Sequence, residues 1–200
     1  MPPSDVSTAP IAEFATQLEA VGGHAERAAT TGELAELIVA IAGTVPEIWA
    51  STDVTTTVPA LVRALTDAGI AVRSPHDPAE ARDKPLGLAL ARAAIAETGS
   101  VLLVEPRVAD RSVSLITQTL IVLCPEPAIV PTLDEAAGIL RAISRDGANY
   151  ATFVTGPSRT ADIERELTVG VQGPGALHVL FTKSLDDQAE GRSIAPNRQV

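Results

Sequence analysis

Four stretches of the chain place apolar residues at positions i, i+3, i+4 and i+7, the spacing of an amphipathic helix. They run over residues 11–18, 34–41, 58–65 and 133–140. A capping box precedes the second and the fourth, formed by Thr30 with Glu33 and by Thr132 with Glu135. In such a box the two side chains bond free N–H groups at the start of a helix. We therefore expect four helices, two of which begin directly after Thr30 and Thr132.

Short apolar runs of strand character lie between and after these helices. They occupy residues 48–50, 70–72, 101–104, 120–123, 151–154 and 177–181. Helices that alternate with such strands predict an α/β fold with a mainly parallel sheet covered on both faces. In sheets of this kind ligands bind beyond the carboxyl ends of the strands.

With 200 residues the chain fits one domain of ordinary size. We expect an N-terminal helical segment over residues 1–30, an α/β domain over 31–183 and a loose polar tail over 184–200. Residues 74–85, rich in proline and charge, predict a surface loop within the domain.

The charge balance excludes two classes of partner. The formal net charge is -10 and no basic stripe is visible, which argues against nucleic acid and against an anionic membrane surface. The N-terminus has neither a basic nor an apolar targeting region, and no apolar run approaches the roughly 18 residues of a membrane span. We therefore expect a cytoplasmic protein.

Cysteine and histidine usage predicts no metal and no cofactor. Cys124 is the only cysteine, so the sequence supports no disulfide, no redox pair and no iron–sulfur site. His24, His76 and His178 are scattered without metal-ligand spacing. We expect Cys124 to be a buried small residue and His178 to be a core histidine with its hydrogen bonds satisfied.

The first candidate site is the turn Glu97-Thr98-Gly99, which precedes a strand. Gly99 permits a tight turn with positive φ. A carboxylate displayed there can act as a base, a nucleophile or a ligand anchor. The alternative is an ordinary β-turn with a solvated glutamate.

The second candidate is the turn that follows the strand 151–154. Gly156 and Pro157 form the turn, and Ser158 or Thr160 can cap a helix that begins near Thr160. Free N–H groups at that helix start, together with the hydroxyls and Arg159, predict an anion pocket. Its ligand-binding residues are Thr155, Gly156, Ser158, Arg159 and Thr160, alongside Thr98 and Gly99 of the first turn. The alternative is a well-capped helix without a ligand.

Other motifs are absent. The glycines of residues 169–178 do not fit GxGxxG, and a strand follows them where a dinucleotide site requires a helix. Neither a Walker A loop nor a GxSxG elbow is present.

Three stretches in this order, AIAETGSVLLVE, LITQTLIVLCPEPAIVPTLDEA and FVTGPSRTADIERELTVGVQGPGALHVLF, resemble the LUD domain, the lactate-utilisation protein family. The resemblance implies a three-layer Rossmann-like α/β fold similar to the sugar-phosphate isomerase and CoA-transferase group. It implies an accessory component of L-lactate oxidation to pyruvate that works with two iron–sulfur partner proteins. The ligand would be a small carboxylate or phosphate, or the site would bind a partner protein.

The resemblance favours functional roles for Glu97 and Arg159. The Glu-x-Gly turn is also similar to that of CoA-transferases, whose glutamate forms an acyl-enzyme intermediate, so Glu97 is the candidate catalytic residue. Two alternatives stay open: a CoA-transferase-like or phosphosugar-isomerase-like enzyme that uses Glu97, and an interaction module without a working pocket.

Two further residues bear on the site. Relatives commonly carry an aspartate shortly before the AETG turn, where this chain has Arg92. If that aspartate binds ligand, this protein has a different substrate or a non-functional site. Glu105, at the end of the next strand, could support the site or be a simple edge carboxylate.

Overall fold

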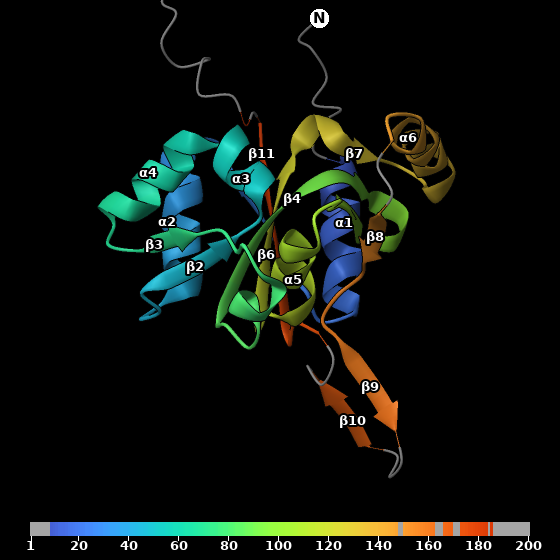
Figure 1. The fold of residues 1–200 in the computed structure, drawn as a ribbon. Helices are drawn as coiled ribbons and strands as arrows, with labels where there is room; N and C mark the ends of the chain where they lie inside the picture. Colours follow the sequence, from blue (N-terminus) through green and yellow to red (C-terminus); the bar gives the residue numbers. More distant parts are fainter. Residues whose placement is uncertain (1–8, 148–149, 163–165, 170–172, 184, 186–200) are drawn as a thin grey trace, which may run out of the picture.

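A computed structural model describes residues 9–147, 150–162, 166–169, 173–183 and 185 (Figure 1). The helices are α1 (Ala9–Ala20), α2 (Thr31–Ala42), α3 (Thr52–Thr57), α4 (Pro59–Asp67), α5 (Val108–Ile116) and α6 (Leu133–Arg145). The strands are β1 (His24–Ala28), β2 (Glu47–Ala50), β3 (Ala71–Arg73), β4 (Leu86–Ile95), β5 (Ser100–Val104), β6 (Thr119–Pro125), β7 (Ile129–Val130), β8 (Ala151–Val154), β9 (Arg159–Asp162), β10 (Glu166–Val169) and β11 (Ala176–Thr182). Single 3₁₀ turns form at η1 (Pro78–Ala81), η2 (Ala96–Thr98) and η3 (Glu126–Ala128).

The main sheet has the strand order β1-β11-β6-β4-β2-β3, and every neighbouring pair along this path is parallel. Their carboxyl ends therefore meet at one edge of the sheet. We call this the carboxyl edge and the opposite one the amino edge.

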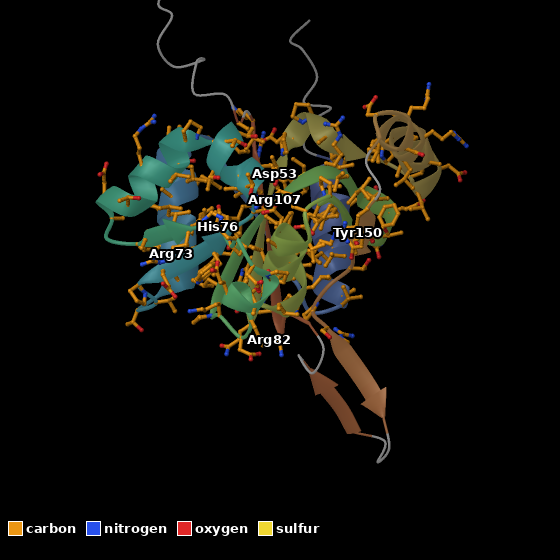
Figure 2. The ribbon with its side chains drawn as sticks, viewed as in Figure 1. Asp53, Arg73, His76, Arg82, Arg107 and Tyr150 are labelled. Atoms are coloured by element: carbon orange, nitrogen blue, oxygen red, sulfur yellow. The ribbon has the colours of Figure 1, made fainter. Side chains whose placement is uncertain are left out.

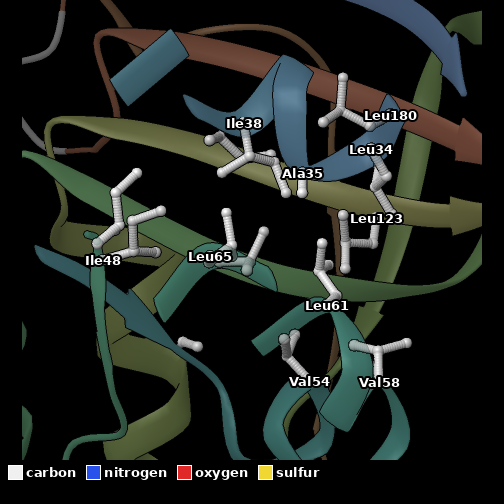
Figure 3. Packing of buried hydrophobic residues seen from close by; sticks show 14 of the residues in the cluster. Leu34, Ala35, Ile38, Ile48, Val54, Val58, Leu61, Leu65, Leu123 and Leu180 are labelled. Atoms are coloured by element: carbon white, nitrogen blue, oxygen red, sulfur yellow. The ribbon is translucent and has the colours of Figure 1, made fainter. Parts of the chain in front are cut away.

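Helices cover both faces of this sheet. Along β4 and β6, Leu88 and Leu123 face a cluster built with α2, α3 and α4, whereas Ala89 and Val122 face the cluster built with α1. Figure 3 shows the first cluster, in which Leu34 and Ile38 of α2 pack beside Leu61 and Leu65 of α4. The arrangement confirms the expected three-layer α/β architecture with a mainly parallel sheet.

Strand β4 belongs to two arrangements at once. Its first half pairs with β6 and β2, and its second half pairs antiparallel with β5, which in turn pairs antiparallel with β8. The register between β4 and β5 shifts between Ala91 and Ala93, so Arg92 occupies a β-bulge. Both alanines are buried and Arg92 is exposed. Helix α6 covers this second half through a cluster of Ala93, Leu102 and Ile143.

The four helices and six strands expected from the sequence all form. Thr30 and Thr132 cap α2 and α6 as the capping boxes predict, and each hydroxyl accepts a hydrogen bond from the N–H three residues later. Seven further helices and strands of the described residues, β1, β4, β7, β9, β10, α3 and α5, were not expected. The loop predicted over residues 74–85 contains the short turn η1.

The prediction of a helix that begins near Thr160 is wrong. Residues 159–162 form the strand β9, which pairs antiparallel with β10. The partner segment Glu166-Leu167-Thr168-Val169 is rich in β-branched and apolar residues, which favour a strand. Its ladder hydrogen bonds with β9 are formed in place of helical ones. In Figure 1 this ribbon projects away from the main sheet.

The N-terminal segment supplies a strand as well as a helix. β1 pairs with β11 at residues His24 to Ala28, so residues of the expected segment 1–30 and of the expected domain 31–183 share one sheet. The segment boundaries stay predictions. Apart from Leu185, the tail expected over 184–200 lies outside the described residues.

Candidate functional site

A pocket of about 770 Å³ opens at the carboxyl edge, beyond the ends of β2, β6 and β11. We call it the carboxyl-edge pocket. Its polar lining includes Thr52, Asp53, Arg92, Arg107 and Asp110, and its apolar lining includes Leu90, Ala91, Val104, Pro106, Pro125, Ala128 and Leu185. The location is the one at which α/β sheets bind ligands. An apolar cavity with a few convergent polar groups is also typical of small-molecule sites.

Arg92 reaches this pocket because of the bulge in β4. Side chains of a regular strand alternate between the two faces, and an extra residue re-aims one of them. Here the bulge leaves Ala91 and Ala93 buried and turns Arg92 into the pocket. Among the described residues its guanidinium forms no ion pair. It is therefore available to an anionic ligand.

Arg107, by contrast, is held in place by its neighbours. It pairs with Asp110, with 3.6 Å between nitrogen and oxygen, and donates a hydrogen bond to the Thr52 hydroxyl. Asp110 Oδ1 accepts hydrogen bonds from Thr52 N at 3.0 Å and Thr52 Oγ1 at 2.9 Å. Asp110 is only 3% exposed, so this network fixes one wall of the pocket. Figure 2 shows Arg107 close to Asp53 near the centre of the molecule.

Two carboxyl groups beside this wall have perturbed acidity. Burial raises the pKa of Asp53 above its ordinary value, and the nearby Asp110 adds to the effect, while its own backbone N–H and the Ser51 hydroxyl oppose it. Burial likewise raises the pKa of Glu105 to about 7, opposed by the hydrogen bond from Ser114. Asp53 and Asp110 raise the pKa of Glu105 further by charge repulsion. Perturbed carboxyl groups beside a pocket are candidates for acid–base work.

Glu105 is well buried. It is 3% exposed, its Oε2 accepts a hydrogen bond from Ser114 Oγ at 2.6 Å, and its Oε1 has no partner among the described residues. Arg111 donates to the carbonyl oxygens of Glu105 and Pro106 and stacks on the Tyr150 ring at 3.9 Å, which fixes the backbone of this turn.

Glu97 lies elsewhere, at the start of α6. Its Oε1 accepts a hydrogen bond from Leu133 N at 2.6 Å. A carboxylate at this position satisfies a free N–H of the helix start and interacts favourably with the helix dipole. The structure thus gives Glu97 a capping contact, and its catalytic role stays a prediction.

The two candidate turns do meet in space. Thr98 Oγ1 donates to Ser100 Oγ at 2.8 Å, and Ser100 Oγ lies 2.6 Å from Thr155 Oγ1. Gly99 has φ of +61°, as expected, and a Cβ there would lie 2.5 Å from Leu18 N of α1. Gly156, with φ of +75°, packs in the same way against Val21, directly after α1.

The rest of the second candidate lies toward the amino edge. Arg159 donates to the carbonyl oxygen of Val21, and Ser158 N donates to Pro174 O at 2.8 Å, close to the start of β11. Thr160 belongs to β9, and its side chain is outside the described residues. None of the seven candidate residues whose side chains the structure describes lines the carboxyl-edge pocket.

The pocket residues could be only partly predicted from sequence. Arg92 and Glu105 were singled out, but Thr52, Asp53, Arg107 and Asp110 carried no motif. The available signal was position, since Thr52 and Asp53 directly follow the predicted strand 48–50. Side chains at such strand ends form the binding crevice in parallel sheets.

Within the described part of the chain, no group of three or more histidine, cysteine or carboxylate side chains is placed to hold a metal ion. The described helices are also all too short or too polar to cross a membrane.

The family model of the LUD domain matches residues 11–182. The chain belongs to the LUD domain family. This match covers nearly all of the described fold, including α1 and β1, which the sequence resemblance covered only loosely.

Three curated relatives of this LUD domain are each named lactate utilization protein C. The one from Bacillus velezensis is 39% identical over 98 residues, which are 48% of this chain and 41% of the relative. The one from Macrococcus caseolyticus is 40% identical over 92 residues, which are 44% of this chain and 40% of the relative. The one from Bacillus subtilis is 37% identical over 98 residues, which are 48% of this chain and 41% of the relative. The matched region thus spans about two-fifths of the length of each relative.

A solved structure supports the fold of this LUD domain. The crystal structure of a DUF162 family protein from Deinococcus radiodurans aligns with a TM-score of 0.66 at 24% identity. The alignment covers 88% of this chain and 98% of the other. The α/β architecture is therefore shared between the two proteins.

Proposed function

We propose that this LUD domain is a lactate-utilisation-type protein that binds a small carboxylate, of the 2-hydroxy or 2-oxo acid class, in the carboxyl-edge pocket. Arg92 is the observation that carries the proposal: an arginine without an ion-pair partner among the described residues, turned into the pocket by a β-bulge. Its planar guanidinium can bind both oxygens of a carboxylate at once. The names of the curated relatives supply the class of acid.

The charged lining of the pocket consists of two arginines, Arg92 and Arg107, and three aspartates, Asp53, Asp110 and Asp146. Arg107 and Asp110 neutralise each other as an ion pair, and both are held by Thr52. Arg92 is therefore the cation on this lining that is left for a ligand. The residue that departs from the family pattern thus lies in the pocket.

The proposed role in lactate oxidation is accessory. Oxidation of L-lactate to pyruvate releases two electrons, and an iron–sulfur cluster that accepts them needs several thiolate ligands. These 200 residues contain the single Cys124, which is buried. The proposal therefore places the electron acceptor in partner iron–sulfur proteins, with this domain binding the small acid.

Thermal unfolding against a panel of anions tests the proposal. The panel contains lactate, pyruvate, larger 2-oxo acids, phosphate, sugar phosphates and acyl-CoA, because the pocket is larger than a three-carbon acid requires. A ligand at about 100 times its dissociation constant stabilises the fold by about 2.7 kcal/mol, a rise of a few degrees in Tm.

Three matched arginine variants locate the site. Arg92→Ala should abolish the rise, whereas Arg82→Ala, an exposed arginine outside the pocket (Figure 2), should keep it. Arg159→Ala tests the alternative placement near Thr155. A rise lost only in Arg159→Ala would move the site to that turn. No rise with any carboxylate would refute the proposal and favour an interaction module.

A further inference from the structure

Two carboxyl groups, Asp53 and Asp110, line the carboxyl-edge pocket, and both raise the pKa of the buried Glu105. Asp53 belongs to the first turn of α3, Glu105 follows β5, and Asp110 belongs to the first turn of α5. Each influences the ionisation of another: Asp110 raises the pKa of Asp53, and both raise the pKa of Glu105. They therefore act as one electrostatic group.

The three carboxyl groups differ in the hydrogen-bond and ion-pair partners of their oxygen atoms. Asp110 is committed to Thr52 and Arg107. Glu105 is buried behind the lining, with Ser114 on one oxygen. Asp53 lines the pocket, is only partly buried, and forms no ion pair among the described residues. Its own backbone N–H and the Ser51 hydroxyl lower its pKa as hydrogen-bond donors. Of the three, Asp53 is the one that lines the pocket without an ion-pair partner among the described residues, so a ligand can touch its carboxylate.

The same pocket holds an anchor for the ligand. Arg92 and Arg107 share its lining with Asp53. A 2-oxo acid bound through its carboxylate would present its carbonyl group and the adjacent carbon to the neighbouring side chains. A base beside an anchored carboxylate, with a cation to receive developing charge, is the arrangement that proton abstraction next to a carbonyl requires.

We propose that Asp53 is a general base that removes a proton from the carbon next to the carbonyl of a 2-oxo acid held by Arg92. The proposal rests on the proposed function. With pyruvate, the methyl C–H bond breaks and its proton passes to Asp53. The electron pair forms a C2–C3 double bond, and the carbonyl π electrons move to oxygen as an enolate stabilised by the positive charge of Arg92. Return of a proton from Asp53 restores pyruvate, so no oxidant or second substrate is needed.

Glu105 has a positioning role in this proposal. It is buried and electrostatically coupled to Asp53, and its charge state changes near neutral pH because burial raises its pKa to about 7. When Glu105 ionises, its negative charge makes Asp53 harder to ionise and a stronger base. The charged groups that share the pocket with Asp53 are Arg92, Arg107, Asp110 and Asp146, and the buried Glu105 is coupled to Asp53. The pH profile of proton removal therefore reports on this group as a whole.

Deuterium exchange into pyruvate tests the proposal directly. The purified protein is mixed with pyruvate in D₂O, and loss of the methyl signal is followed by proton NMR against buffer alone. We expect the protein to accelerate exchange. Asp53→Asn should lower the protein-dependent rate on the order of 10²-fold or more, the contribution of a general base. Glu105→Gln should keep exchange but shift its pH profile.

Two controls separate chemistry from folding and binding. Asp67→Asn removes one exposed carboxylate of α4 and should leave exchange unchanged. The rise in Tm with pyruvate should persist in Asp53→Asn, because Arg92 is intact. Stabilisation by pyruvate without faster exchange in the unmodified protein overturns this inference and leaves the proposed function standing. Exchange that survives in Asp53→Asn overturns the role of Asp53. Neither stabilisation nor exchange with any 2-oxo acid overturns both proposals.

Discussion

His24 and His178 stack face to face across the parallel pair β1 and β11, with ring centroids 5.1 Å apart. His178 was expected to be a core histidine with satisfied hydrogen bonds. Instead its Nδ1 is buried and has no partner among the described residues. Burial and the neighbouring His24 lower the pKa of His178, and Glu26 partly opposes them.

This pair predicts a loss of stability at mildly acidic pH. The unfolded chain protonates His178 near its ordinary pKa of 6.5, whereas the folded protein does so only at lower pH. Protons therefore favour the unfolded state as the pH falls through that value. Urea unfolding of the unmodified protein and of His178→Asn between about pH 5.5 and 7.5 isolates this contribution from that of other groups. The free energy of unfolding of the unmodified protein minus that of the variant should fall as the pH falls. His76→Asn, which removes an exposed imidazole, is the control. An unchanged slope in His178→Asn would contradict the assignment.

Glu105 predicts the opposite pH dependence. Its pKa rises from 4.5 in the unfolded chain to about 7 in the folded protein, so the folded state favours the neutral acid. Stability should fall as the pH rises through this window, by up to about 3 kcal/mol. Glu105→Gln cannot ionise at this position. The Tm of this variant minus the Tm of the unmodified protein should therefore be larger at pH 8 than at pH 5. Glu19→Gln, on the exposed face of α1, controls for the loss of one charge.

The capping contact of Glu97 predicts a stability effect. Glu97→Ala removes the hydrogen bond to Leu133 N and should cost about 1 kcal/mol in denaturant unfolding. Thr132→Ala, which removes the other cap of α6, should cost a similar amount.

If Glu97 is instead the nucleophile of a CoA-transferase, Glu97→Gln will abolish acyl-CoA exchange. An exchange activity that Glu97→Gln leaves unchanged removes that mechanism.

Substitution of Gly99 by alanine should cost more stability than the same substitution at another glycine with positive φ. A Cβ at position 99 would lie 2.5 Å from Leu18 N and 2.8 Å from Gln17 C, both backbone atoms of α1. At Gly69, with φ of +88°, a Cβ would meet nothing within 4 Å. Gly69→Ala should cost roughly 1–2 kcal/mol through its backbone conformation alone. Gly99→Ala should add roughly 1–3 kcal/mol of overpacking. Equal losses in the two variants would show that α1 moves aside.

The periodic elements of this fold could be predicted because their residues report directly on burial. The helices around Leu34 and Leu61 and the strand around Leu120 each carry one consistent spacing. Strand β4 was missed because both of its faces are buried. Its residues, mostly alanine and leucine, alternate neither in polarity nor at helical spacing.

The site was harder to predict because it depends on tertiary pairing. The bulge at Arg92 exists only where β4 meets β5, and the group of Asp53, Glu105 and Asp110 comes from segments more than 50 residues apart at its extremes. The local sequence around Thr160 was also insufficient, because a glycine-containing turn after a strand can lead into either a helix or another strand. The pairing partner at residues 166–169 decided the outcome.

The bulge in β4 separates two demands on one strand. Ala91 and Ala93 are buried in the core, whereas Arg92 between them is exposed and lines the carboxyl-edge pocket. A point mutation there can reverse the charge that a ligand meets without repacking the sheet. Among proteins built on this scaffold, ligand preference can therefore diverge at a single codon while the core stays constant.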